Sequence, residues 1–148
     1  AWNYFMSVDT PENAEFIETW HAFIGDAERV TNDPMEAHYI GFNMWAAAVE
    51  KAGTTEADAI IDAIVGIEVP NLTGGTAVML PNHHITKPVL IGEIQADGQY
   101  DVVWETEDLV PGDAWSDYLP ESAVLEADWT APINCGNYNT VTKTCGGS

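Results

Sequence analysis

NDPMEAHYIGFNMW, residues 32–45, begins the part of the chain that decides the fold. The segments VPNLTGGT (69–76), LPNHHITKP (80–88) and DGQY (97–100) follow it. In this order they predict a long helix, a Gly-rich turn and a two-stranded ribbon. Because helical periodicity comes first and β signals follow, the sequence indicates a mixed α/β chain.

The long helix is predicted to start at Asp33, which precedes Pro34 and can cap free backbone N–H groups. Glu36, three residues on, can reach back and complete a capping box. Gly53 provides the stop. Apolar or small residues recur at spacings of three and four, which predicts a packed face: Ala37, Ile40, Gly41, Met44, Trp45, Ala48, Val49 and Ala52.

Two further helices flank this one in the sequence. The first is predicted to begin with Thr10 as N-cap, followed by Pro, and to end near Gly25. The other is predicted to begin at Thr55 and to end before Gly66, with apolar residues on one side. Both are typical of amphipathic helices that lie on a sheet.

The β signals lie mainly after residue 69. Residues 76–80 predict a strand, and residues 88–95 and 99–105 predict a hairpin around Ala96-Asp97-Gly98, where Gly permits a positive φ. The aromatic run 2–6 predicts a further short strand or the exit from a strand. The alternation in the second hairpin strand predicts one buried side, made of Tyr100, Val102 and Trp104.

These segments resemble the C-terminal third of the urea-type substrate-binding proteins of ABC transporters, members of the type I periplasmic binding protein family. That family includes receptors for branched-chain amino acids and short-chain amides. The resemblance covers nearly the whole chain and implies a partial type I periplasmic-binding-protein fold. In the family, two α/β lobes are joined by three hinge crossings, with the ligand between them. The resemblance therefore implies that the chain is a fragment of a longer receptor, as does the absence of an initiator Met and a signal peptide.

The predicted domain organisation has two parts. Residues 1–106 form the receptor part, and residues 107–148, rich in Pro and irregular in pattern, form an extended wrapping tail. Cys135 and Cys145 are the only cysteines and bracket a short polar segment, so a disulfide between them is predicted. Two free thiols in a cytosolic protein are the alternative. The disulfide favours an oxidising compartment.

Composition excludes several classes of function. Twenty-four acidic residues against four basic ones give a net charge of −20, which repels nucleic acid and anionic lipid. We therefore expect no nucleic-acid partner. The acidity attracts cations or keeps the surface soluble, and it says little about the ligand. No stretch near twenty apolar residues is present.

Five residues are candidates for ligand binding. Glu36, His38 and Tyr39 lie at the start of the long helix, near free N–H groups, and the resemblance implies that the matching turn approaches the cleft. For a ligand such as urea, Glu36 would accept from amide N–H groups and Tyr39 would donate or form a wall. One helix face cannot hold all three. The alternatives are that Glu36 only caps the helix, His38 lies on the surface and Tyr39 packs in the core. Trp2 and Tyr4 are candidates because the family runs a hinge near them, with core packing as the alternative.

Catalysis and metal binding have weaker support. The chain has no Gly-x-Ser-x-Gly, phosphate-loop, His-Glu-x-x-His or dinucleotide motif, so we expect no enzyme, no cofactor and no catalytic residue. His83 and His84 are adjacent on an extended segment and point to opposite sides, so no metal site is expected. A carboxylate-based hydrolase is kept as a remote alternative, because a chain so rich in acids brings some carboxylates together.

The predicted function is that of a periplasmic or extracellular solute receptor that delivers urea or a short-chain amide to an ABC transporter permease. A lipid anchor on the parent protein is left open. The alternative is a structural or assembly-forming fragment with no ligand of its own. In either case, the remainder of the receptor chain or another copy is expected to cover apolar surface that this chain leaves exposed.

Overall fold

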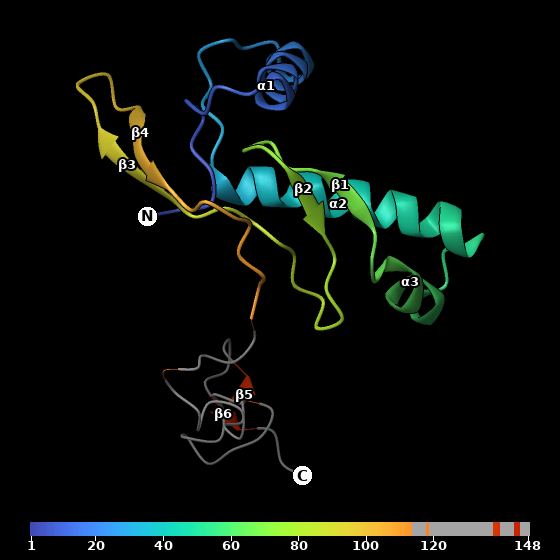
Figure 1. The fold of residues 1–148 in the computed structure, drawn as a ribbon. Helices are drawn as coiled ribbons and strands as arrows, with labels where there is room; N and C mark the ends of the chain where they lie inside the picture. Colours follow the sequence, from blue (N-terminus) through green and yellow to red (C-terminus); the bar gives the residue numbers. More distant parts are fainter. Residues whose placement is uncertain (114–117, 119–137, 140–143, 146–148) are drawn as a thin grey trace. The chain divides into compact units, whose positions relative to one another are not determined.

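A computed structural model describes residues 1–113, 118, 138–139 and 144–145. The chain divides into two compact units, Ala1–Asp113 and Ala114–Ser148. In the first unit, three helices are followed by two antiparallel strand pairs (Figure 1). The fold is mixed α/β, as predicted, while the division into a receptor part and a wrapping tail at residue 106 stays a prediction.

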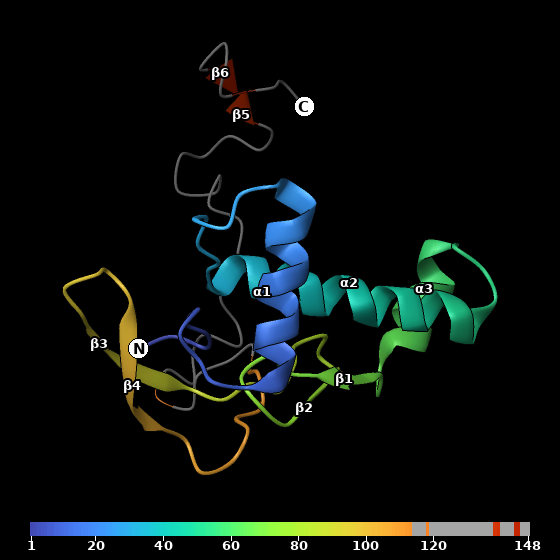
Figure 2. The same ribbon diagram turned by 90° about the horizontal axis from the view of Figure 1, so that it is seen from above.

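Helix α1 spans Pro11–Ile24 and has the predicted ends. The Thr10 side chain accepts a hydrogen bond from the Asn13 backbone N–H, and Gly25 ends the helix in the left-handed region with φ 69°. A residue with a Cβ is strained in that region, so Gly is the favoured stop. Figure 2 shows α1 crossing the first turns of α2.

Helix α2 spans Asp33–Ala52, and its first turn differs from the prediction. The N-cap is Asn32, whose side chain accepts from the Met35 N–H at 3.0 Å, so Asp33 is already helical. The predicted capping box is wrong, because the Glu36 side chain is turned into the protein interior and has no exposed surface. Gly53 ends the helix with φ 66°, as predicted.

Helix α3, Ala57–Ile64, begins later than predicted and has no side-chain cap. The Thr54 side chain accepts from the Glu56 N–H, which keeps the chain in a turn before the helix. Lys51, in the last turn of α2, donates to the Ala63 carbonyl at 2.8 Å. This bond holds the end of α3 against the end of α2, where Figure 1 shows the two side by side.

Strands β1 (Glu68–Pro70) and β2 (Thr76–Val78) form an antiparallel pair against α2. The turn between them closes through the Asn71 N–H and the Gly75 carbonyl, at 2.9 Å. The main core lies between this pair and α2, where the chain forms two layers (Figure 1). Its buried members are Ile40, Met44, Ala77 and Met79, with Ile64, Ile67, Val69 and Ile85 packed around them.

Strands β3 (Leu90–Ile94) and β4 (Tyr100–Glu105) form the predicted hairpin. Its turn closes through the Gln95 N–H and the Gln99 carbonyl at 2.8 Å, and Gly98 has φ 84°. The predicted buried side is wrong: Trp104 is 51 % exposed and Val102 is 38 % exposed. Both faces of β4 are open after Tyr100, because no described element forms a second layer over either face.

Of the two alternatives predicted for the N-terminal segment, the structure has the strand exit and not the full strand. Trp2 forms a single bridge, donating to and accepting from the Leu90 backbone. Extension of this ladder would bring Tyr4 opposite Pro88, which has no N–H to donate. Instead Asn3 binds the Pro88 carbonyl and the Asp33 side chain. A second buried cluster follows, made of Tyr4, Phe16 and Leu72 with Ile17 beside it.

The second unit contains strands β5 (Tyr138–Asn139) and β6 (Thr144–Cys145), which pair antiparallel. Cys135 lies outside the described residues, so the disulfide to Cys145 stays a prediction. Most of the predicted irregular tail also lies outside them. In the portion of the chain that the structure describes, no helix is long and apolar enough to cross a membrane.

Candidate functional site

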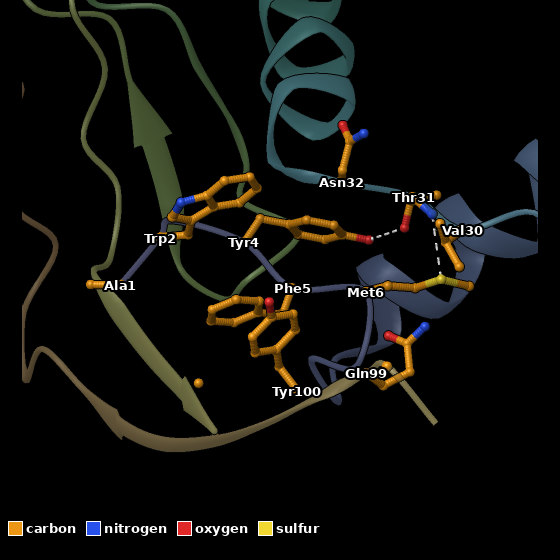
Figure 3. A pocket seen from close by; sticks show the side chains of 12 residues that line it. Ala1, Trp2, Tyr4, Phe5, Met6, Val30, Thr31, Asn32, Gln99 and Tyr100 are labelled. Carbon is orange, nitrogen blue, oxygen red and sulfur yellow. Dashed lines mark hydrogen bonds between the residues drawn. The ribbon is translucent and has the colours of Figure 1, made fainter. Parts of the chain in front are cut away.

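A cavity of about 340 Å³ opens in the first unit, between the N-terminal segment, the loop before α2 and the tip of the β3–β4 hairpin (Figure 3). Three separate segments of the sequence therefore contribute to it. It is within the size range of small-ligand pockets. The lining residues are Ala1, Trp2, Tyr4, Phe5, Met6, Val30, Thr31, Asn32, Gly92, Gly98, Gln99 and Tyr100.

Aromatic rings form the walls of this cavity. Phe5 and Tyr100 are stacked, with ring centroids 4.7 Å apart and planes at 24°. A Cβ at Gly92 would lie 2.8 Å from Phe5 Cζ, so only glycine in β3 allows this ring to lie so close. Trp2 is 53 % exposed and stands at the rim, held through its backbone by Leu90. The walls therefore offer flat apolar surface to a ligand.

Tyr4 is fully buried and its hydroxyl is engaged. Its Oη lies 2.8 Å from Asn13 Oδ1 and 2.7 Å from Thr31 Oγ1. Burial raises the pKa of Tyr4 to about 12, and the nearby Glu36 charge adds to this, while the bond from Thr31 opposes it. The phenol is therefore protonated throughout the physiological pH range.

The lining contains no Asp, Glu, Lys, Arg or His side chain. Its polar side chains are those of Tyr4, Thr31, Asn32, Gln99 and Tyr100, of which Asn32 already caps α2 through Oδ1. A neutral ligand fits such a lining, because a buried carboxylate without a cation or several hydrogen bonds loses its hydration without compensation.

Glu36 does not line the cavity. Its carboxylate forms an ion pair with Lys87, which lies on the segment before β3. Burial raises the pKa of the Glu36 carboxyl above its usual range, and the Lys87 charge and hydrogen bond oppose this only in part. The second oxygen, Oε2, is buried without a hydrogen bond of normal geometry, although the nearby Leu72 N–H still favours the ionised form.

His38 and Tyr39 are exposed, whereas Glu36 is buried. The His38 ring donates from Nδ1 to the Pro34 carbonyl at 2.7 Å, and Tyr39 packs on Phe16 with ring centroids 4.8 Å apart. They line an open apolar groove between α1 and α2. The structure thus brings Trp2 and Tyr4 together in the cavity and separates them from Glu36, His38 and Tyr39. Ligand contact by any of the five stays a prediction.

Sequence reasoning missed much of the cavity. Phe5, Gln99 and Tyr100 are among its lining residues, and none of them was a candidate. The hairpin turn at Gly98 was predicted, which places Gln99 and Tyr100 at an exposed tip. No local signal, however, brings a hairpin tip to the N-terminal segment, because that contact depends on the packing of distant segments.

The adjacent histidines have ordinary hydrogen bonds. His83 Nε2 lies 3.2 Å from the Ile61 carbonyl, and His84 Nδ1 lies 3.1 Å from the Asn82 carbonyl. Among the described residues, no group of three or more His, Cys, Asp or Glu side chains is arranged to hold a metal ion.

Residues 1–121 match the family model of the periplasmic binding protein domain. The chain belongs to the periplasmic binding protein family. The family-level part of the predicted resemblance is confirmed, whereas the assignment to the urea-type branch stays a prediction.

Two solved structures are similar to the chain. One is a solute binding protein of an ABC transporter from Rhodopseudomonas palustris BisB5, in complex with 3,4-dihydroxybenzoic acid, at 18 % identity and TM-score 0.61. The match covers 72 % of this chain and 30 % of that one, and supports the fold alone. The other, from Rhodopseudomonas palustris HaA2 in complex with p-hydroxybenzoic acid, has 25 % identity and TM-score 0.56. It covers 78 % of this chain and 31 % of that one.

A curated relative corrects one prediction. The chain is 30 % identical over 109 residues to limonene hydroxylase of Geobacillus stearothermophilus, a match to 74 % of this chain and 20 % of the relative. The relative carries the name of an enzyme, so the prediction that the chain is no enzyme is contradicted. The physical reason is that missing motifs in 148 residues say nothing of a longer enzyme that contains such a segment. The chain spans about a fifth of that relative's length.

Proposed function

We propose that the chain is part of an extracytoplasmic solute receptor that captures a small molecule and delivers it to an ABC transporter permease. The observation that carries this proposal is the family match over residues 1–121. The two similar structures, both solute binding proteins of ABC transporters, support it. Capture would shift the receptor toward a closed form, which the permease would bind preferentially.

For the ligand, we propose a small neutral amide such as urea. The resemblance to urea-type receptors suggested this class, and the absence of charged side chains from the cavity lining supports it. An amide offers N–H donors and a carbonyl acceptor, which pair with side-chain amides and hydroxyls without a counter-charge.

A second ligand class is an aromatic acid. The stacked rings of Phe5 and Tyr100 and the exposed Trp2 suit a flat ring, and the two similar structures contain hydroxybenzoic acids. In this case the remainder of the receptor would have to supply the cation that the cavity lining lacks. A direct comparison of the two classes decides between them.

The test is calorimetric titration of the longest available form of the protein with urea, acetamide and p-hydroxybenzoate. We expect saturable heat with the amides and none with the acid. Trp2→Ala removes one wall and should weaken amide binding about fivefold, since an aromatic contact contributes about 1 kcal/mol. Trp104→Ala is the matched control, because Trp104 is 51 % exposed against 53 % for Trp2 and does not line the cavity.

Heat with p-hydroxybenzoate alone would overturn the amide assignment and retain the receptor. Absence of saturable heat with all three compounds would favour the alternative of a structural or assembly-forming fragment. Equal loss of affinity in Trp2→Ala and Trp104→Ala would remove the cavity as the binding site.

A further inference from the structure

A buried polar network lies behind the cavity wall and joins three segments of the chain. Asn13, in the first turn of α1, is 1 % exposed, Tyr4 is 0 % exposed and Thr31 is 5 % exposed. Asn13 does not line the cavity, whereas Tyr4 and Thr31 do. Figure 3 shows the Tyr4 ring facing the cavity with its hydroxyl directed at Thr31.

The direction of each hydrogen bond follows from counting protons. Asn13 Nδ2 donates to the Met6 carbonyl at 2.9 Å and to the Val8 carbonyl at 2.7 Å, which uses both of its hydrogens. Asn13 Oδ1 can only accept, so the Tyr4 hydroxyl donates to it at 2.8 Å. Tyr4 has then no proton left, and the Thr31 hydroxyl must donate to Tyr4 Oη at 2.7 Å.

This network fixes the cavity wall from outside. The two carbonyls that Asn13 binds flank the bend that follows Tyr4 and Phe5. The Thr31 N–H also lies 3.4 Å from Met6 Sδ, which ties the loop before α2 to the same bend. Every polar atom of the Asn13 side chain thereby has a hydrogen-bond partner. Loss of any of these partners would leave an Asn13 atom buried and unsatisfied.

We infer that Asn13 is a positioning residue for the ligand cavity, acting through Tyr4 and Thr31, and that Tyr4 serves as a wall and gives no hydrogen bond to the ligand. Because the Tyr4 proton is committed to Asn13, hydrogen bonding to the ligand falls to other lining groups. Gln99 is the foremost of these, since its side-chain amide lines the cavity and forms no hydrogen bond with any of the described residues. The effect of Asn13 on ligand binding rests on the proposed function. Its effect on the position of the cavity wall does not.

The experiment compares Asn13→Asp with Asn71→Asp. The first keeps the shape and the acceptor but removes both donors to Met6 and Val8. The second is a matched control, because Asn71 is also fully buried, donates from Nδ2 to the Thr86 carbonyl and lies away from the cavity. Hydrogen exchange is followed by mass spectrometry without ligand, and urea affinity is measured at a temperature at which each variant is folded.

We expect Asn13→Asp to raise exchange in residues 2–8 at least tenfold, to leave residues 40–49 protected and to weaken urea binding about tenfold. Asn71→Asp should leave residues 2–8 unchanged. Thr31→Val, which lacks the donor, should reproduce the effect in milder form, and Thr31→Ser, which keeps it, should restore wild-type behaviour. The two Thr31 variants test the same network if Asn13→Asp does not fold.

Unchanged exchange in residues 2–8, or a rise shared equally by the whole unit, would overturn the positioning role whether or not the protein binds urea. A local rise without any loss of affinity in a wild-type protein that binds urea would overturn it as well. A local rise in a protein whose wild type binds no ligand would leave the wall geometry standing and defeat the proposed function instead.

Discussion

The body of the first unit, residues 33–85, and the β3–β4 hairpin, residues 90–105, have similar apolar content but differ in how much of it is buried. In the body, Met44 and Ala77 are fully buried between α2 and the β1–β2 pair. In the hairpin, Val103 is 57 % exposed and Trp104 is 51 % exposed. Alternation therefore marks a strand that can be buried, while burial itself needs a second layer.

Exposed apolar residues in the body bear on the predicted need for a covering partner. Even in the body, Trp45 is 42 % exposed and Phe42 is 64 % exposed on the outer side of α2, where their rings lie 5.7 Å apart. Apolar surface of this kind is typical of interfaces. Coverage by the remainder of a receptor chain or by another copy stays a proposal.

The largest effect is expected where the body holds the chain that leads into the hairpin. Lys87→Met would leave the Glu36 carboxylate buried without its cation and should lower the free energy of unfolding by about 3–5 kcal/mol. Urea or guanidinium denaturation at pH 7 measures this. Arg29→Met is the control, since the Arg29–Asp26 pair is exposed and should contribute less than about 1 kcal/mol.

Adding Glu36→Gln to Lys87→Met should recover part of that loss, because no buried charge then remains unpaired. A loss below about 1 kcal/mol in Lys87→Met alone would mean that the pair does not anchor this segment. The Glu36–Lys87 pair would then not connect the stability of the body to the hairpin.

A smaller effect is expected from large-to-small substitutions, which test the burial difference directly. Met44→Ala should lower the free energy of unfolding by about 3 kcal/mol, because it leaves a cavity between α2 and β2. Trp104→Ala should lower it by about 1 kcal/mol or less, since half of the side chain is in water. Similar losses at both positions would show that the hairpin is covered in solution.

The smallest effect is a pH dependence that the body has and the hairpin lacks. The folded-state pKa of Glu36 is above its ordinary value of 4.5, so the folded protein holds this proton more strongly than the unfolded chain. The stabilisation that this bound proton contributes is complete below pH 4.5 and is lost as the pH rises through the folded-state pKa. Over that range the unfolding free energy falls by at most about 1.4 kcal/mol per pH unit.

The measurement is the difference in unfolding free energy between wild type and Glu36→Gln from pH 4 to pH 8. We expect this difference to fall as the pH rises. Glu105→Gln, on the exposed hairpin, is the control, because it removes a carboxylate and leaves the Glu36–Lys87 pair intact. A difference that rises with pH would mean that Lys87 dominates over burial at Glu36.

Local features of the fold were predictable from single residues. Helix α1 begins after Thr10 and ends at Gly25, α2 ends at Gly53, and Gly98 forms the hairpin turn, all as predicted. Each of these residues acts only on a few neighbouring backbone groups. Asn32 and Asp33 are both suitable N-cap residues. The sequence pattern predicted Asp33, whereas Asn32 is the N-cap in the structure. The candidate site was less predictable. Trp2 and Tyr4 line the cavity, while Phe5 and Tyr100, which also line it, were not among the predicted ligand-binding residues.

The helices, the turns and the α/β class follow from the sequence alone, because caps, glycines and periodicity act over a few residues. The tertiary structure alone decided which side of each element is buried. It turned Glu36 inward to a lysine 51 positions away in the chain and stacked Phe5 on Tyr100 from the far end of the unit. The physical reason is that burial depends on what other segments bring to a surface, and this is set by packing rather than by neighbouring residues.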